Sequence, residues 1–414
     1  MQNKQSLFLL FSANAISGFA QGISMLAIPW YFASRHESSY FTLAYGLITL
    51  LVMFFGLYAG TLVDRFSRKN NFLFTNLVCF FLIGSISILG FFQELPNFLI
   101  IAVFGITMLN YNIHYPTLYA FGHEISKPEE YSKINSSIEV VGQSTSIFSG
   151  AFAGLLLEGI NKGYGKIFGF YVHMPFGIEP WKIHEIFLLD ASTYLIACIL
   201  IAFIKYTPVH HFNPETGSLS KRIQSGFSYL KKHPKQLLFG LFSYSVFAAL
   251  IVSIHALIPI YVENRLNETG SVFAAADLIY AIGALFAGLF TSFIFKKTNP
   301  LHAVIILTFL AASLYLSLYI SASVWLLYLF SVLMGISNAG TRILRLTYLF
   351  NHVPNELMGR VNSIFNMANV FVRALFIFCF SIPFFTFGYH IIYAFLILSL
   401  FLFLSGWILI RSRD

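Results

Sequence analysis

The sequence predicts an all-α membrane protein with twelve transmembrane helices in two pseudo-symmetric six-helix bundles. Three observations support this prediction. Of the 414 residues, 57% are hydrophobic and only 10% are charged, whereas a soluble domain is about 45–50% apolar and about 25% charged. Twelve apolar runs are long enough to cross a membrane, and motifs of the first half recur in the second. A water-soluble enzyme is excluded, and so is a transmembrane β-barrel, in which apolar and polar residues alternate.

The twelve spans follow from the length of the apolar runs, because a helix needs about 20 apolar residues to cross the hydrocarbon core. The longest polar stretch, 207–236, separates six spans from six, and its part from Ser218 to Lys232 has the helical spacing of a surface helix. We therefore expect an N-terminal bundle at 1–206, a cytoplasmic linker with a surface helix at 207–236 and a C-terminal bundle at 237–414. The runs lie at about 6–33, 40–63, 72–94, 97–123, 135–160, 186–206, 237–262, 272–295, 301–321, 324–350, 361–386 and 388–410.

The basic residues predict the orientation. Of the 25 Lys and Arg, seventeen fall on the side of the N-terminus, five on the opposite side and three inside spans. Because positive residues accumulate in cytoplasmic loops, both termini are expected in the cytoplasm of a bacterial cell, with the chain in its inner membrane. The basic residues form no stripe for nucleic acid. Cys79, Cys198 and Cys379 lie far apart in apolar runs, so neither a metal centre nor a cofactor is expected.

Two loops reveal the internal repeat. Residues 128–136 read P-E-E-Y-S-K-I-N-S and residues 354–363 read P-N-E-L-M-G-R-V-N-S. With one inserted residue, four positions are identical, one is basic in both and one is β-branched in both, at an offset of 226–227. Ala59-Gly60 matches Ala287-Gly288 at an offset of 228. Two halves related by an axis along the membrane normal are typical of a transporter with its substrate near the midplane. Three pairs of small residues predict close helix contacts: Gly56 and Gly60, Gly150 and Gly154, Ala284 and Gly288.

The segment G-T-L-V-D-R-F-S-R-K, from Gly60 to Lys69, resembles the loop between spans 2 and 3 of the major facilitator superfamily. The resemblance implies alternating access by rocking one half against the other, with a latch at the cytoplasmic ends when the cavity opens outward. The alternative is that the basic residues are only topology anchors. The expected latch consists of Gly60, Asp64, Arg65, Arg68 and Lys69.

Further segments suggest subfamilies. V-P-N-E-L-M-G-R-V-N-S (353–363) and S-Y-L-K-K-H-P (228–234) resemble drug and siderophore exporters such as the enterobactin-exporter and macrolide-efflux groups. The region from Tyr115 to Gly154 is similar to spans 4 and 5 of lysophospholipid transporters. Ser149-Gly150 stands where drug/proton antiporters of the superfamily carry a Gly-Pro pair. This departure argues against ordinary drug efflux.

Polar residues inside the spans are the candidate substrate-binding groups, because a charge at this depth normally faces a cavity or a partner. Arg342 and Arg345 stand three residues apart in span 10, and Arg373 lies about halfway along span 11. Such a set favours an anionic substrate bound by forked donors. The alternatives are that Arg345 snorkels and that Arg373 pairs with an acid. The full predicted set is Arg342, Arg373, Arg345, His255, Asn14, Gln21 and Asn338.

Two acids are the predicted proton carriers. Glu139 lies in span 5 and Asp277 in span 8, and an intramembrane carboxyl group can carry a proton through a transport cycle. Asp190 and Glu158, near the ends of spans 6 and 5, come after them. The alternative role for each acid is to pair with a nearby Arg or Lys.

The predicted function is secondary active transport of an anionic or amphiphilic organic solute, siderophore-like first. The chain carries no nucleotide-binding loop, so an ion gradient, of protons first, is the expected driving force of an efflux antiporter. Lysophospholipid transport and multidrug efflux are the alternatives. A membrane enzyme such as an acyltransferase is a different class, and the sequence shows no His-x4-Asp pair for it. The expected partners are the small anionic substrate and membrane lipids, and the protein is expected to be a monomer.

Overall fold

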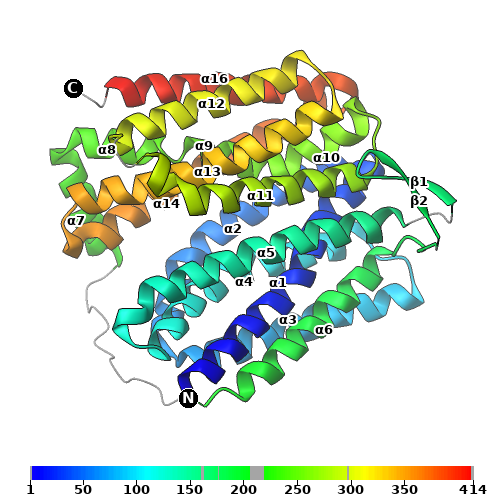
Figure 1. Cartoon of the computed structure of the whole chain (residues 1–414), viewed down its shortest axis with the longest axis horizontal. Coiled ribbons are helices and arrows are strands. Elements are labelled where there is room, and N and C mark those ends of the chain that lie inside the picture. Colours follow the sequence, from blue (N-terminus) through cyan, green and yellow to red (C-terminus); the bar gives the residue numbers. More distant parts are fainter. Residues whose placement is uncertain (1, 160–162, 176, 206–218, 296–297, 412–414) are drawn as a thin grey trace. The chain divides into compact units, whose positions relative to one another are not determined.

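The computed structural model describes residues 2–159, 163–175, 177–205, 219–295 and 298–411 (Figure 1). Within these residues, twelve helical spans are long and apolar enough to cross a membrane, which confirms the predicted fold class. The first half contains α1 (Gln2–Ser34), α2 (Ser38–Arg65), α3 (Arg68–Phe92), α4 (Asn97–Glu124), η1 (Pro128–Glu130), α5 (Tyr131–Glu158), β1 (Gly163–Ile167), β2 (Phe170–Met174) and α6 (Ile183–Ala202).

The second half begins with the helix α7 (Leu219–Lys232), in the segment where the sequence predicts a surface helix. Span 7 consists of α8 (Pro234–Phe242), α9 (Ser245–Val252), η2 (Ser253–Leu257), α10 (Ile258–Ile260) and η3 (Tyr261–Arg265). The remaining elements are α11 (Gly270–Ile294), α12 (Pro300–Ile320), α13 (Val324–His352), α14 (Asn355–Phe380), α15 (Pro383–Thr386), η4 (Gly388–His390) and α16 (Ile391–Arg411).

The helices form two compact units. The first comprises Met1–Arg35, Leu50–Pro214 and Thr269–Leu278, and the second comprises His36–Thr49, Glu215–Glu268 and Ile279–Asp414. The beginning of α2 thus belongs to the second unit and the beginning of α11 to the first. The sequence predicts each bundle as one continuous range, 1–206 and 237–414, and does not predict that two short segments group with the other unit.

In the first unit, α6 packs against both α1 and α3, and α5 packs against α1. Figure 1 shows these helices side by side. Apolar side chains such as Leu10, Phe72, Phe121 and Ile201 fill the interior at one end of the unit. Because this interior is apolar, a polar side chain buried between the helices is expected to form its hydrogen bonds with other groups of the same unit.

In the second unit, α12 packs against α13 and α16. The helices α11 and α13 approach each other so closely that glycine is required at the contact. A Cβ atom on Gly335 would lie 2.2 Å from the Tyr280 carbonyl oxygen, and one on Gly283 would lie 2.1 Å from the Val332 carbonyl oxygen. Gly288, predicted as part of this kind of contact, has nothing within 4 Å of such a Cβ. That prediction is wrong for Gly288, because the contact lies on the helix face of Gly283 and Ala284.

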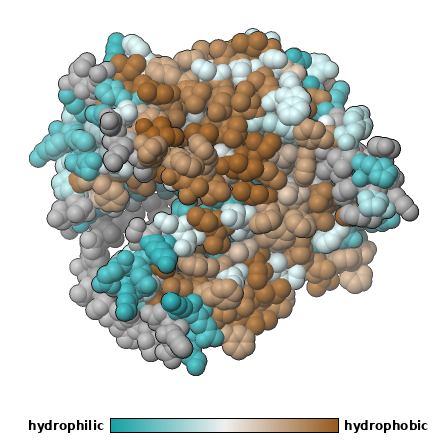
Figure 2. All heavy atoms as spheres, in the orientation of Figure 1, coloured by the Kyte–Doolittle hydropathy of each residue, from teal (hydrophilic) through white to brown (hydrophobic). Residues whose placement is uncertain are grey.

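The helices present apolar side chains on their outside. Phe92 is 85% exposed, Phe293 and Phe387 are each 78% exposed, and many Leu and Ile side chains are exposed beside them. Figure 2 shows hydrophobic side chains along the middle of the helices and hydrophilic ones toward their ends. In hydrocarbon an apolar exterior is the stable one, since lipid replaces water as the solvent.

A β-hairpin follows α5. Strands β1 and β2 are antiparallel, with Gly163 opposite Met174 and Ile167 opposite Phe170. Phe168 and Gly169 form the turn with φ values of 55° and 82°, the left-handed pair that a two-residue hairpin turn needs. The Phe168 N–H donates to Ser271 Oγ over 3.3 Å. The tip of the hairpin therefore contacts the beginning of α11.

Span 7 contains two π-helical turns. In η2 the Ile258 N–H donates to the Ser253 carbonyl, and after η3 the Leu266 N–H donates to the Tyr261 carbonyl. Pro259 stands four residues after His255, and a proline ring clashes with the carbonyl group four residues before it. The wider turn relieves this clash. Such turns frequently occur at functional sites.

Candidate functional site

Arg373, His255, Tyr45 and Phe247 form a cluster in the second unit. Arg373 comes from α14 and lies near Tyr45 of α2 and His255 of η2. The His255 and Tyr45 rings meet edge to face with centroids 5.8 Å apart, and the Tyr45 hydroxyl donates to the Ile251 carbonyl over 3.4 Å. The Arg373 guanidinium carbon is 5.4 Å from the centre of the Phe247 ring. The structure thus brings two predicted substrate-binding residues, Arg373 and His255, together.

Arg373 is a buried charge whose surroundings contain no acidic partner in the described part of the chain. No carboxylate among the described residues forms an ion pair with it, and its buried Nε atom has no hydrogen-bond acceptor there. A guanidinium group remains charged at any physiological pH, and a buried charge without a counter-ion is costly. The cluster is therefore ready to accept an anionic group, with aromatic side chains as the apolar part of its wall.

Arg345 occupies a different place in the same unit. It is 6% exposed, its Nη1 donates to the Ser243 carbonyl over 3.3 Å and its guanidinium carbon lies 3.5 Å from the centre of the Tyr244 ring. The Asn369 amide also donates to the Tyr244 carbonyl. These contacts fix the junction of α8 and α9 against α13 and α14. Arg345 does not snorkel, whereas Arg342 is exposed on α13.

Arg345→Ala is expected to lower the free energy of unfolding by about 2 kcal/mol or more, because a cavity forms and the Ser243 carbonyl loses its charged donor. Substrate affinity should change far less than in Arg373 variants. Thermal unfolding of purified protein and a ligand-binding titration measure the two quantities. Loss of affinity with unchanged stability would instead identify Arg345 as a binding residue.

The remaining predicted binding amides have partners within their own units. In the second unit, Asn338 Nδ2 donates to the Tyr280 hydroxyl over 2.9 Å. In the first unit, Asn14 Oδ1 lies 2.8 Å from His114 Nε2, and Gln21 Nε2 donates to the Tyr194 hydroxyl over 2.9 Å. These bonds explain the amides as links between helices, and a role in substrate binding stays a prediction.

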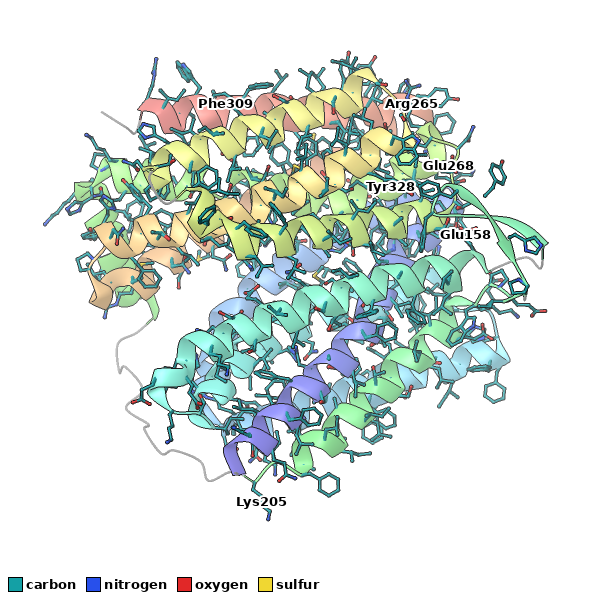
Figure 3. The ribbon with its side chains drawn as sticks, in the orientation of Figure 1. Glu158, Lys205, Arg265, Glu268, Phe309 and Tyr328 are labelled. Carbon is teal, nitrogen blue, oxygen red and sulfur yellow. The ribbon has the colours of Figure 1, made fainter. Side chains whose placement is uncertain are left out.

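The predicted proton carriers both lie in the first unit. Glu139 of α5 accepts a hydrogen bond of 2.7 Å from the Tyr119 hydroxyl of α4. Asp277, partly buried on α11, lies near Tyr111 of α4. Glu158, the weaker candidate at the end of α5 (Figure 3), accepts a 2.7 Å hydrogen bond from the Gly270 N–H. It caps the first turn of α11, where a negative charge is stabilised by the helix dipole.

Two members of the predicted latch have defined structural contacts. Arg68 Nε donates to Glu124 Oε1 over 3.2 Å and links the beginning of α3 to the end of α4. Lys69 Nζ donates to the Ala202 and Ile204 carbonyls over 2.8 Å each, so it caps the end of α6. The surroundings of Gly60 and the side chains of Asp64 and Arg65 lie outside the described part of the chain, and the latch stays a prediction.

The structure makes two residues prominent, of which the sequence did not predict Tyr45 and ranked Asp190 below Glu139 and Asp277. Tyr45 faces His255 and Arg373, but a tyrosine in an aromatic-rich span gives no sequence signal. Asp190 is 0% exposed. The predicted span 6 begins at residue 186 and α6 begins at Ile183, so Asp190 lies in the second turn of the helix and not at its edge.

Comparison with known proteins decides the family. Residues 10–377 match the Major Facilitator Superfamily. The chain belongs to this superfamily of transporters. The superfamily resemblance inferred from the sequence is confirmed, and membership indicates a multi-pass membrane transporter rather than a membrane enzyme.

Within the Major Facilitator Superfamily, the curated relatives are efflux proteins. Macrolide efflux protein A of Streptococcus pyogenes is 22% identical over 291 residues, which cover 69% of this chain and 66% of that protein. The protein of the same name from Enterococcus faecalis is 23% identical over 239 residues, which cover 57% of this chain and 66% of that protein. The matches span just under two thirds of these relatives. The resemblances to enterobactin exporters and lysophospholipid transporters stay predictions.

Solved structures share the fold of this superfamily member. The nucleoside transporter NupG aligns with a TM-score of 0.74 at 12% identity, over 99% of both chains. A bacterial homologue of the human lysosomal transporter Spinster aligns with a TM-score of 0.71 at 10% identity, over 100% of this chain and 98% of that one. A bacterial homologue of the iron transporter ferroportin aligns with a TM-score of 0.70 at 12% identity, over 99% of both. At such identities the likeness is one of fold.

Proposed function

We propose that this transporter moves an organic solute with an anionic group across a bacterial inner membrane by alternating access. The observation that carries the proposal is Arg373, a buried guanidinium group without an acidic partner among the described residues. A carboxylate or phosphate would supply the missing charge through charge-assisted hydrogen bonds. Phe247, Tyr45 and His255 would contact the apolar part of the solute. A carboxylate siderophore comes first and a lysolipid second.

An ion gradient, of protons first, is the proposed driving force, with substrate and ion exchanged in an antiport cycle. We further propose that both termini are cytoplasmic, that Gly60, Asp64, Arg65, Arg68 and Lys69 latch the cytoplasmic ends, and that the protein acts as a monomer among lipids. These proposals rest on the charge distribution of the loops and the motif at 60–69. Glu139 and Asp277 are the carboxyl groups predicted from the sequence for proton coupling.

Macrolide efflux is a second candidate function, and the relatives named macrolide efflux protein A favour it. Many macrolides carry a protonated amine, and a cation is repelled by an unpaired guanidinium group. The two candidates therefore predict opposite preferences for the charge of the solute.

Flux into proteoliposomes containing the purified full-length protein tests the proposal. A carboxylate siderophore, a lysolipid and a macrolide are compared as labelled substrates, each with and without an imposed pH gradient. We expect flux of one of the two anionic substrates, accelerated by the gradient and absent from protein-free vesicles. Flux of the macrolide with none of either anionic substrate would overturn the proposal in favour of the second candidate.

A further inference from the structure

Asp190 lies on the buried face of α6, where this helix packs against α1 and α3 (Figure 1). Its side chain is 0% exposed. Tyr194 stands four residues further along α6 and is 1% exposed, and residues four apart share one face of a helix. The carboxyl group is thus inside the first unit and not on a surface that lipid or water reaches.

No basic group neutralises Asp190. Neither of its carboxyl oxygens has a hydrogen-bond donor among the described residues, and no described Lys, Arg or His forms an ion pair with it. The titratable side chains around it are Cys79 of α3, Tyr111 of α4 and Tyr194 of α6, and α1 contributes none. All three are neutral near pH 7. A bare carboxylate here would carry a large desolvation cost.

Two further polar groups lie in this region. Ser24 Oγ of α1 faces the carboxyl group but does not form a hydrogen bond of normal geometry with it. On α4, Asn110 lies beside Tyr194, the neighbour of Asp190, and neither of its amide atoms has a hydrogen bond of normal geometry among the described residues. Ser24 is 0% and Asn110 is 4% exposed. Buried polar atoms are normally satisfied, so oxygens from three helices that lack a hydrogen bond of normal geometry among the described residues indicate a ligand that accepts lone pairs.

We propose that Asp190 binds one monovalent cation, a proton or Na⁺, inside the first unit, and that this cation is the coupling ion of transport. The second part rests on the proposed function. Either ion cancels the single negative charge, and the hydroxyl and amide oxygens of Ser24 and Asn110 suit a hard cation. A divalent ion would leave a net charge buried, since no described second carboxylate lies among these contacts.

Asp190 fits this role better than the two acids predicted from the sequence. Glu139 already accepts the Tyr119 hydrogen bond, and Asp277 is only partly buried. Asp190 is fully buried and has no hydrogen-bond donor of normal geometry among the described residues. A negative charge there carries a large cost, which makes its charge state dependent on the ion.

Thermal unfolding of the purified full-length protein in detergent tests the binding step without any substrate. In one arm, NaCl replaces choline chloride at constant total salt concentration and pH 8.5. In the other arm, the pH is lowered from 8.5 to 5.5 in choline chloride without NaCl. A ligand that binds only the folded state raises the unfolding temperature, and a proton held more tightly in the folded state does so as the pH falls. We expect wild type to respond in one arm, which identifies the ion.

Asp190→Asn should abolish that response, while the matched acid variant Glu139→Gln should keep it. If Asp190→Asn does not fold, Ser24→Ala replaces it and should shift the midpoint of the same titration severalfold in ion concentration. The proposal is wrong if wild type responds in neither arm, or if the substituted protein titrates as wild type does.

Coupling is then measured separately, with the substrate that the flux assay identifies. Asp190→Asn should lose gradient-driven accumulation but keep substrate exchange without a gradient. Accumulation that survives in Asp190→Asn would overturn the coupling role. Absence of any flux in wild type would instead refute the proposed function. Cation binding at Asp190 would then still be decided by the thermal-unfolding titration.

Discussion

Replacing Arg373 with Gln is expected to weaken the binding of a carboxylate-bearing substrate about ten- to a hundredfold. Hydrogen bonds to charged groups contribute about 1.5–3 kcal/mol each, which corresponds to that range of affinity. The effect should be large because the guanidinium group has no acid to pair with among the described residues, so its charge is available to the solute. A cationic ligand of similar size should bind better to Arg373→Gln than to wild type.

Two further variants sharpen this measurement. Arg373→Lys keeps the charge but loses the planar fork, so it should restore only part of the affinity if the contact is bidentate. Arg360→Gln is the matched control, since it removes the same charge from the same helix, where Arg360 Nη1 donates to Ser225 Oγ of α7. Its affinity should equal that of wild type. Stronger binding of the cation by wild type than by Arg373→Gln would refute an anion site at Arg373.

Gly335→Ala is expected to destabilise the folded protein by about 1–3 kcal/mol, and Gly335→Leu should leave no folded protein to purify. The added Cβ would meet the Tyr280 carbonyl oxygen at 2.2 Å and the Ala284 nitrogen at 2.7 Å. Both are backbone atoms of α11, so no side-chain rotation relieves the overlap and the two helices must separate. Samples are heated to a series of temperatures, and size-exclusion chromatography then measures how much folded protein remains, which gives the loss of stability.

Gly288→Ala provides the control for this prediction. Gly288 lies on α11 as well, but a Cβ there has nothing within 4 Å. The substitution removes a residue with low helix propensity, so the protein should be as stable as wild type or slightly more stable. Equal melting temperatures for Gly335→Ala and Gly288→Ala would contradict the prediction, because they would show that α11 and α13 can move apart without a loss of stability.

The fold was predictable because its signals are long and redundant. Each span is about twenty apolar residues, and the repeated loops at 128–136 and 354–363 recur in the structure as a proline shortly before α5 and α14, three residues before α5 and one residue before α14. A pattern of this length survives an error of several residues at either end. The helix α7 was equally readable, since its basic and apolar residues alternate with helical spacing.

The site was only partly predictable, because it depends on which helix faces meet. Charge in an apolar span identified Arg373 and His255, but not that Tyr45 from another span lies beside them. The same signal could not separate Arg345, held by Ser243 and Tyr244, from Arg373, which no described acid holds. Asp190 was ranked below Glu139 and Asp277 because its importance comes from the partners that it lacks among the described residues. Absence of a partner is a property of packing and leaves no trace in composition.

Among the described residues, π turns occur only in span 7, and they give this span an additional freedom. Each wide turn holds one residue more than an α turn, and such an extra residue can slide along a helix without unwinding the segments beyond it. A slide by one position rotates the side chain it passes by about 100°. His255 lies inside η2, and Pro259 keeps the wide turn from closing completely. A shift of the wide turn by one residue would therefore rotate the His255 imidazole about the helix axis, while both ends of span 7 keep their positions.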